Sequence, residues 1–453
     1  MTTSALHHRA HLTPLVDSSN STWSGPLRFA SCYVTIALLV FGPLAFGAVE
    51  PWSMFILHIG AVGAFILWIL SIVTARRAQL ELQAIHLPPF IFACVVIGQI
   101  FLGGSAYRHE TVTQFMNFVA YGLLFLIATD IFRNEREVRT LCLTLAVLGF
   151  ALALLGSVQE FTSGGKLYWV RSPRFGGPIF GPYVNRNHYA GVMELLFPFA
   201  LMGSLKPGLT GSKRILLGFA ALLMISTVFL CGSRGGFISV VLQVLFIAVV
   251  LLWRSRQVGL VLTLTLVFIL SAAFGTWLGS DRLLGRLGDV PSELQTEKSG
   301  GRLQLAKDSL QMFKQRPLTG FGLGTFPVIY PKYRTFVTDL YVNEAHNDFV
   351  QLLVETGIIG FSVGIGLLVI VFRRGLQQIR GAVFGSWRTV AVCASVVSVV
   401  GLSVHSLFDF NLQIPANALL FYVLCAIAGS TSEEDADVIR RIGRESGTSV
   451  VDA

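Results

Sequence analysis

Long apolar stretches, separated by short charged segments, dominate this sequence. A helix needs about 20 predominantly apolar residues to cross the hydrocarbon core of a bilayer, and reading between the charged residues gives about 12 segments of that size. The chain is 53% hydrophobic and only 13% charged, whereas an average soluble domain has roughly 25% charged residues. The sequence therefore predicts an all-α polytopic membrane protein with spans at Phe29–Ala48, Pro51–Ala75, Leu87–Tyr107, Thr111–Thr129, Thr140–Gln159, Asn187–Leu205, Ile215–Ser233, Gly235–Trp253, Gln257–Ser280, Thr356–Phe372, Thr389–Phe408 and Phe410–Ser430.

The basic residues of the loops predict the orientation of these spans. If the N-terminus is cytoplasmic and every span crosses, each cytoplasmic loop carries Lys or Arg, as the positive-inside rule requires. The predicted order is a cytoplasmic tail over 1–28, nine spans within 29–280, a large loop over 281–345, three spans within 346–430 and a cytoplasmic tail over 431–453. The large loop and a shorter one over 160–186 fall on the periplasmic side, where we expect the chemistry.

Composition argues against several other classes of site. The six cysteines stand singly in or beside apolar segments without C-x-x-C spacing, so neither a disulfide framework nor a metal site is predicted. The net charge of +9 is spread over many short loops, so it indicates membrane orientation and not binding to nucleic acid. We expect no cofactor and no metal.

Two arginines lie at predicted membrane boundaries on the periplasmic side. Arg234 stands between small residues in "CGSRGGF", and Arg302 follows two glycines at the end of the large loop. A guanidinium group offers a planar fork of donors that suits phosphate oxygens, and two of them on one face could neutralise a diphosphate. The structural alternative for each is an interfacial arginine that reaches to lipid head groups.

The segment after Arg302 predicts a surface helix followed by turns. Helical spacing of apolar residues predicts an amphipathic helix whose apolar face holds Leu303, Ala306, Leu310 and Phe313. In "RPLTGFGLG", Gly320, Gly322 and Gly324 then favour turns. No strand precedes these glycines and no Lys-Ser follows them, so a nucleotide-binding phosphate loop is not favoured.

The stretch "NEAHNDFVQLLVE" places polar residues at the mouth of a predicted span. If it is helical, Asn343, Asn347, Gln351 and Glu355 form a polar stripe that must face protein or water. His346 adjoins the outer end of this stripe. A histidine there is suited to accept a proton near neutral pH, and the alternative is an interfacial histidine that caps the helix.

Two further polar groups lie at outer ends of predicted spans. The sixth span begins at Asn187 and His188 and carries Glu194 two turns deeper, and an acid within a span is a candidate functional residue. In "HSLFDFNLQIPAN", His405, Asp409 and Asn411 lie between the last two spans. Either group could line a polar cavity or join helix to helix by hydrogen bonds.

The stretch "HNDFVQLLVETGIIG" resembles the signature of the O-antigen ligase superfamily. That signature is His followed by Asn, Ser or Gln, then nine residues, Gly, two residues and Gly, and its positions are matched by His346, Asn347, Gly357 and Gly360. The segments "SRGG", "GR...P..GFGLGTF" and "NRNHYAG" are also similar to that superfamily, so the resemblance runs from about residue 185 to residue 417. The first 180 residues resemble it in hydropathy alone.

The resemblance implies a GT-C-type glycosyltransferase of the bacterial inner membrane that needs no nucleotide sugar and no metal. Its donor would be a glycan on undecaprenyl diphosphate, and its acceptor would be lipid A-core or another glycan acceptor. Arg234 and Arg302 would bind the diphosphate leaving group, and His346 would activate the acceptor hydroxyl with inversion at the anomeric carbon. Supporting positions would be Asn347, Gln351, Asn187, Glu194 and His405.

Three functions remain open from the sequence. Ligation of glycan to lipid A-core is favoured by the histidine signature, because the corresponding features of the polymerases are mostly arginine-based. Polymerisation of repeat units, or transfer to a protein or exopolysaccharide, is the second. A bicarbonate or sugar transporter is the third; it should show inverted repeats and broken helices at mid-membrane, and the polar candidates cluster at the outer surface instead.

Overall fold

The computed structural model describes residues 23–75, 83–173, 179–255, 265–266, 268–274, 301–336, 341–381 and 385–431. Within these ranges the regular structure is helical, and the extended pairing consists of two isolated bridges, Leu167–Arg171 and Phe180–Tyr183. The predicted tails, the loop up to residue 300 and most of the predicted span Gln257–Ser280 lie outside the described residues.

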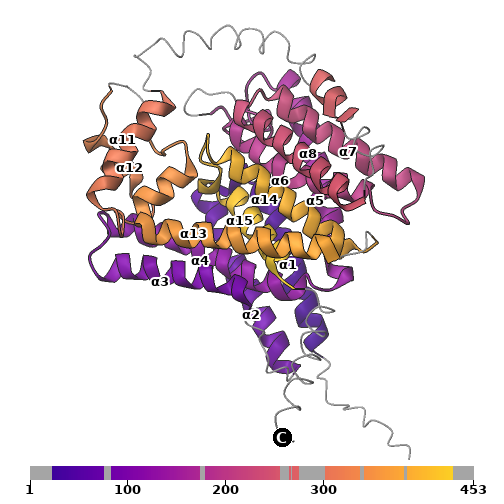
Figure 1. The fold of residues 1–453 in the computed structure, drawn as a ribbon, viewed down its shortest axis with the longest axis horizontal. Coiled ribbons are helices and arrows are strands. Elements are labelled where there is room, and N and C mark those ends of the chain that lie inside the picture. The colour runs from indigo at the N-terminus through magenta and orange to yellow at the C-terminus, as the bar shows by residue number, and fades with distance from the viewer. Residues whose placement is uncertain are drawn as a thin grey trace, which may run out of the picture.

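The helices run in the order expected of a polytopic protein (Figure 1). Nine helices of the described ranges are long and apolar enough to cross a membrane. Helix α6 is not one of these nine, and neither is α15, which is apolar but shorter. The chain is therefore an all-α, multi-pass membrane protein. The helices are α1 (Ser24–Leu44), α2 (Pro51–Thr74), α3 (Leu87–Phe101), α4 (Arg108–Ile131), α5 (Glu135–Thr162), α6 (Arg186–Ser204), α7 (Gly211–Leu230), α8 (Arg234–Ser255), α11 (Arg302–Gln315), α12 (Phe326–Ile329), α13 (Asp348–Gly381), α14 (Trp387–His405) and α15 (Pro415–Gly429).

The core of the bundle is built on α6 and α14. A helix that is apolar on all sides is buried on all sides, and nearly every residue of these two helices is buried. Helices α5, α8 and α15 pack around α14, which lies in the middle of the bundle (Figure 1). The outer helices α2 and α3 keep many large apolar side chains exposed, as expected of surfaces that face lipid.

The loops gather at two opposite ends of the bundle. At one end the buried guanidinium of Arg388 donates to the carbonyls of Phe132 (2.8 Å) and Ser430 (2.7 Å), which ties the start of α14 to the ends of α4 and α15. The Glu135 carboxylate there accepts from the backbone N–H of Trp387 and Arg388 and so caps α14. At the other end α6, α8 and α13 begin and α14 ends; we call this the site end.

The amphipathic helix predicted after Arg302 exists as α11, but its buried face is not the apolar face read from the sequence. Leu303 and Leu310 are exposed, and the buried face holds Leu305, Asp308, Ser309 and Met312. Periodicity of apolar residues missed this face because two of its members are polar. The Asp308 carboxylate accepts from the Tyr330 hydroxyl (3.1 Å), so tertiary hydrogen bonds stabilise its burial.

Helix α13 begins later than the predicted polar stripe and is interrupted once. It starts at Asp348, so Asn343 and Asn347 lie before the helix, and the stripe on it is reduced to Gln351 and Glu355. At Gly357 the backbone is non-helical (φ 64°) and the chain kinks. Helical spacing alone could not reveal a helix start that is fixed by contacts with α14, where the Asp348 N–H donates to the Ser406 carbonyl (2.9 Å).

Alanine at position 357 is expected to destabilise the fold by more than about 3 kcal/mol. The positive φ disfavours any residue with a Cβ, and the added atom would overlap the backbone carbonyl of Leu318. The measurement is the thermal unfolding midpoint in detergent. Gly63→Ala is the matched control, because a Cβ there meets nothing within 4 Å inside helix α2; an equal midpoint for both variants would contradict the role of the kink.

Candidate active site

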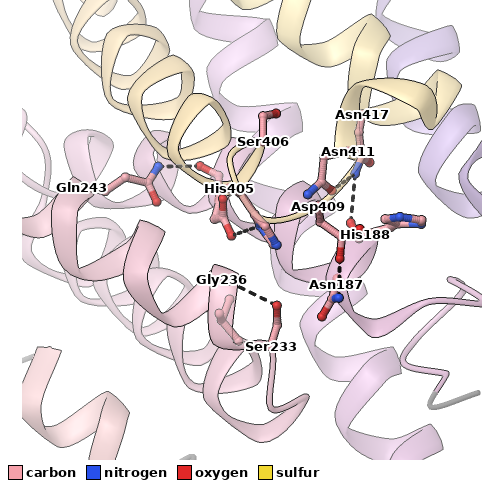
Figure 2. Close-up of polar contacts among 12 residues, drawn as sticks. Asn187, His188, Ser233, Gly236, Gln243, His405, Ser406, Asp409, Asn411 and Asn417 are labelled. Carbon is pink, nitrogen blue, oxygen red and sulfur yellow. Dashed lines mark hydrogen bonds and ion pairs between the residues drawn. The ribbon is translucent and has the colours of Figure 1, made fainter. Parts of the chain in front are cut away.

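A buried carboxylate at the site end joins residues from three distant parts of the chain. Asp409 lies in the turn after α14, and its side chain is 1% exposed. Its Oδ1 lies 3.2 Å from His346 Nδ1, and its Oδ2 accepts from Arg302 Nη2 at 3.3 Å and from the Asn187 amide. Figure 2 shows Asn187 reaching Asp409. Side chains that are far apart in the sequence therefore meet on one carboxyl group.

The charges around Asp409 keep it ionised. Burial alone would raise the pKa of this carboxyl, but the hydrogen bond from His346 and the nearby His188, His346 and Arg302 together hold it well below its usual range. An ionised carboxylate can only accept hydrogen bonds. Nδ1 of His346 therefore carries the proton and donates to Asp409, which leaves the lone pair on Nε2 available as a base.

His346 is presented to solvent by a constrained turn. Its side chain is 37% exposed and its backbone lies in the left-handed region at φ 50°, which disfavours a residue with a side chain. The neighbours hold this conformation: Ala345 N–H donates to Gln351 Oε1 (3.0 Å), and the Asn347 amide donates to the Leu407 carbonyl (2.9 Å). The imidazole also packs edge-on against Phe410, with ring centroids 4.8 Å apart.

The polar residues around the start of α13 bond to one another and so hold the turn that carries His346. The Gln351 amide donates to the carboxylates of Glu344 and Glu355. Burial, reinforced by the charge of Glu355, raises the pKa of Glu344 to about 8, so Glu344 is mostly protonated at neutral pH. Protonation relieves the repulsion between the two acids, and Gln351 can hold both of them.

Residues 316–324, which we call the glycine-rich segment, hold the kink of α13 through backbone hydrogen bonds. Phe321 N–H donates to the Val354 carbonyl (3.1 Å), Gly322 N–H to the Glu355 carbonyl (2.9 Å), and Ile358 N–H to the Pro317 carbonyl (2.8 Å). Gly320, Gly322 and Gly324 have positive φ, and at Gly320 a Cβ would overlap the backbone of Glu355. The segment therefore positions helix α13, which follows His346 in the chain.

Arg234 and Arg302 both begin helices at the site end, but their placements differ. Arg302 is the first residue of α11 and is 53% exposed beside Asp409. Arg234 is the first residue of α8, and the next residue, Gly235, packs against the imidazole of His405, the last residue of α14. The Arg234 backbone is thus placed beside the turn that carries Asp409.

Residues 219–365 match the family model described as O-antigen ligase. This segment resembles an O-antigen ligase domain. The match confirms the resemblance predicted from the sequence, and no curated protein was found to match the chain.

The matched segment contains Arg234, Arg302 and His346, but not Asp409, the partner that Arg302 and His346 share. Asp409 and Asn187 both lie outside the matched residues. Glu194 and His405 also lie outside them and form a buried pair deeper in the bundle, with His405 Nδ1 2.7 Å from Glu194 Oε1. The site is therefore completed by residues that lie before and after the matched segment in the sequence.

Sequence reasoning named Asp409 only as a member of a weaker polar group and missed its central place. The available signal was an acid between two apolar spans in "HSLFDFNLQ". Glu355 was placed in the polar stripe, but its carboxylate accepts from the backbone N–H of Gly324 (2.9 Å) and Phe326 (3.1 Å) and so holds the glycine-rich segment. Within the described ranges, no group of three or more His, Cys, Asp and Glu side chains is arranged to hold a metal ion.

Proposed function

We propose that this protein transfers a glycan from undecaprenyl diphosphate to a hydroxyl group of lipid A-core at the periplasmic face of the bacterial inner membrane. The observation that carries the proposal is that His346 and Arg302 share the buried carboxylate of Asp409. His346 can act as a base, and Arg302 is a cation suited to bind phosphate. The match of residues 219–365 to the O-antigen ligase family model and the multi-pass helical bundle support the same function.

The proposed reaction uses His346 as the base and the arginines as the leaving-group site. His346 Nε2 removes the proton of the acceptor hydroxyl as its oxygen forms a bond to the anomeric carbon. The bond between that carbon and the diphosphate oxygen breaks, its electron pair stays on the diphosphate, and the configuration is inverted. Asp409 stabilises the imidazolium, Arg302 and Arg234 neutralise the diphosphate, and the imidazolium then loses its proton to water.

The lipopolysaccharide of a strain without this protein tests the proposal directly. For a ligase, the deletion leaves bare lipid A-core while polymerised donor accumulates, and expression of the wild-type chain restores the banding. Core that carries a single repeat unit would instead identify a polymerase. Unchanged lipopolysaccharide, together with no transfer by the purified protein in proteoliposomes, would overturn the proposed function.

Arg302→Lys is expected to reduce kcat/KM for the lipid-linked donor about 10-fold to 100-fold. Lysine keeps the charge, but its compact ammonium group cannot contact Asp409 and a phosphate oxygen with the fixed fork of a guanidinium. The measurement is the initial transfer rate against donor concentration, with protein level monitored in parallel. Arg316→Lys, at the other end of α11, is the control, because Arg316 donates to the Gly104 carbonyl away from Asp409; equal losses in both variants would contradict a donor-binding role.

A further inference from the structure

Beneath the candidate active site lies a polar cluster in which α6, α8 and α14 meet. The site ends of α6 and α8 carry Asn187 and Arg234, and the turn after α14 carries Asp409. Deeper in the bundle the fully buried Glu194 of α6 accepts from His405, the last residue of α14, across 2.7 Å. In Figure 2, His405 lies between Gln243 and Gly236 of α8 and the Asp409 turn.

A buried pair of ionisable side chains within a membrane bundle requires an explanation. Burying such groups is unfavourable, and they are retained in spans mostly where function needs them. The remaining inner hydrogen bonds of α6 and α14, such as Ser398 Oγ to the Leu195 carbonyl (2.8 Å), show that neutral groups suffice to join these helices. The ionisable pair is therefore more than is needed for helix packing.

His405 contacts both the turn that carries Asp409 and the start of α8, which carries Arg234. Its carbonyl accepts from the backbone N–H of Phe408 (2.8 Å) and Asp409 (3.0 Å), and these bonds build the turn that presents the Asp409 carboxylate. Its ring lies so close to α8 that a Cβ on Gly235 would be 2.7 Å from Cδ2 and 2.8 Å from Nε2. The imidazole is thus wedged between the Asp409 turn and the residue next to Arg234.

Glu194 fixes the orientation of that imidazole, and Gln243 joins the three helices around it. The Glu194 carboxylate holds Nδ1 and so sets the ring plane and its tautomer. The Gln243 amide donates to the carbonyls of Glu194 (2.9 Å) and Val397 (3.0 Å), which joins α8 to both other helices. Gly401 makes this approach possible, because a Cβ there would overlap the Gln243 side chain.

We propose that the Glu194–His405 pair is a positioning element that sets the distance between Arg234 on α8 and Asp409 after α14, and through them the alignment of the donor diphosphate with His346. The inference rests on the proposed function, because it assigns the pair to that same glycan-transfer site. Neither residue touches substrate. Their effect on transfer is exerted through the placement of Arg234.

The test is a double-mutant cycle on glycan transfer in proteoliposomes with lipid-linked donor. Glu194→Gln keeps the shape of the side chain and removes its charge, and we expect kcat/KM for the donor to fall at least about 10-fold at unchanged protein level. In an Arg234→Lys background the same substitution is expected to cost less than about 3-fold, because the group that it positions is already impaired. His405→Gln should show the same pattern.

Ser398→Ala is the matched control, since it removes a buried hydrogen bond between the same two helices beside Leu195. It is expected to change transfer by the same small factor in both backgrounds. Equal factors for Glu194→Gln in the wild-type and Arg234→Lys backgrounds, or full activity of both single variants, would overturn the positioning role. If the wild-type protein itself transfers no glycan, the proposed function is wrong and this inference fails with it.

Discussion

Replacing His346 with alanine is expected to reduce glycan transfer about 1000-fold without reducing the amount of folded protein. The acceptor hydroxyl must lose its proton as the new bond forms, and Nε2 of the partly exposed His346 is the base that the Asp409 contact leaves available. The fold should tolerate the change, because the imidazole is partly exposed and the backbone bonds of the turn come from its neighbours. The measurement is the single-turnover rate at saturating donor.

His109→Ala is the control for this prediction. His109 is an exposed histidine in the first turn of α4. The start of this helix lies next to the glycine-rich segment, because Ser105 and Thr111 lie close to Gly322. Its replacement is expected to leave transfer within about 2-fold of wild type, as for most surface substitutions. A His346→Ala protein that transfers glycan at the control rate would show that another group removes the proton.

The helical architecture was largely predictable, because apolar length is a property of contiguous residues. Segments such as Pro51–Ala75 became helices with nearly the predicted bounds, α2 ending at Thr74. Departures occur where tertiary contacts decide. Helix α13 starts at Asp348, whose N–H donates to the Ser406 carbonyl, and it kinks at Gly357, where the glycine-rich segment bonds to its backbone. Helix α11 buries Asp308 because Tyr330 and Thr335 donate hydrogen bonds to it.

The candidate site was predictable in its residue types but not in its centre. Arginine beside glycines, and histidine at the mouth of a span, carry their chemistry in the local sequence, so Arg302 and His346 could be named. Asp409 could not be ranked above the other polar residues, because its importance lies in the three side chains that reach it from distant segments. Glu194 and His405 were likewise visible singly, whereas their pairing depends on how α6 packs on α14. The catalytic and binding roles remain predictions.

Asp409→Asn is expected to reduce transfer by about 100-fold to 10,000-fold, although it changes neither the size nor the shape of the side chain. The ionised carboxylate fixes the proton on Nδ1 of His346 and stabilises the imidazolium that forms in the reaction. A neutral amide does not stabilise that cation, and its N–H₂ group can face Nδ1 and favour the wrong tautomer. The substitution also removes the negative charge that pairs with Arg302 across 3.3 Å.

The pH profile separates this role from simple loss of structure. Because the pKa of Asp409 is held below its usual range, near 4 for a free aspartate, the carboxylate stays charged throughout the pH range above about 4. Its contribution is lost only as the pH falls through that depressed pKa. The deficit of Asp409→Asn relative to wild type is therefore expected to persist at every pH above about 4 and to shrink only below it. A deficit that vanishes between about pH 5 and pH 7 would contradict the role of an ionised Asp409.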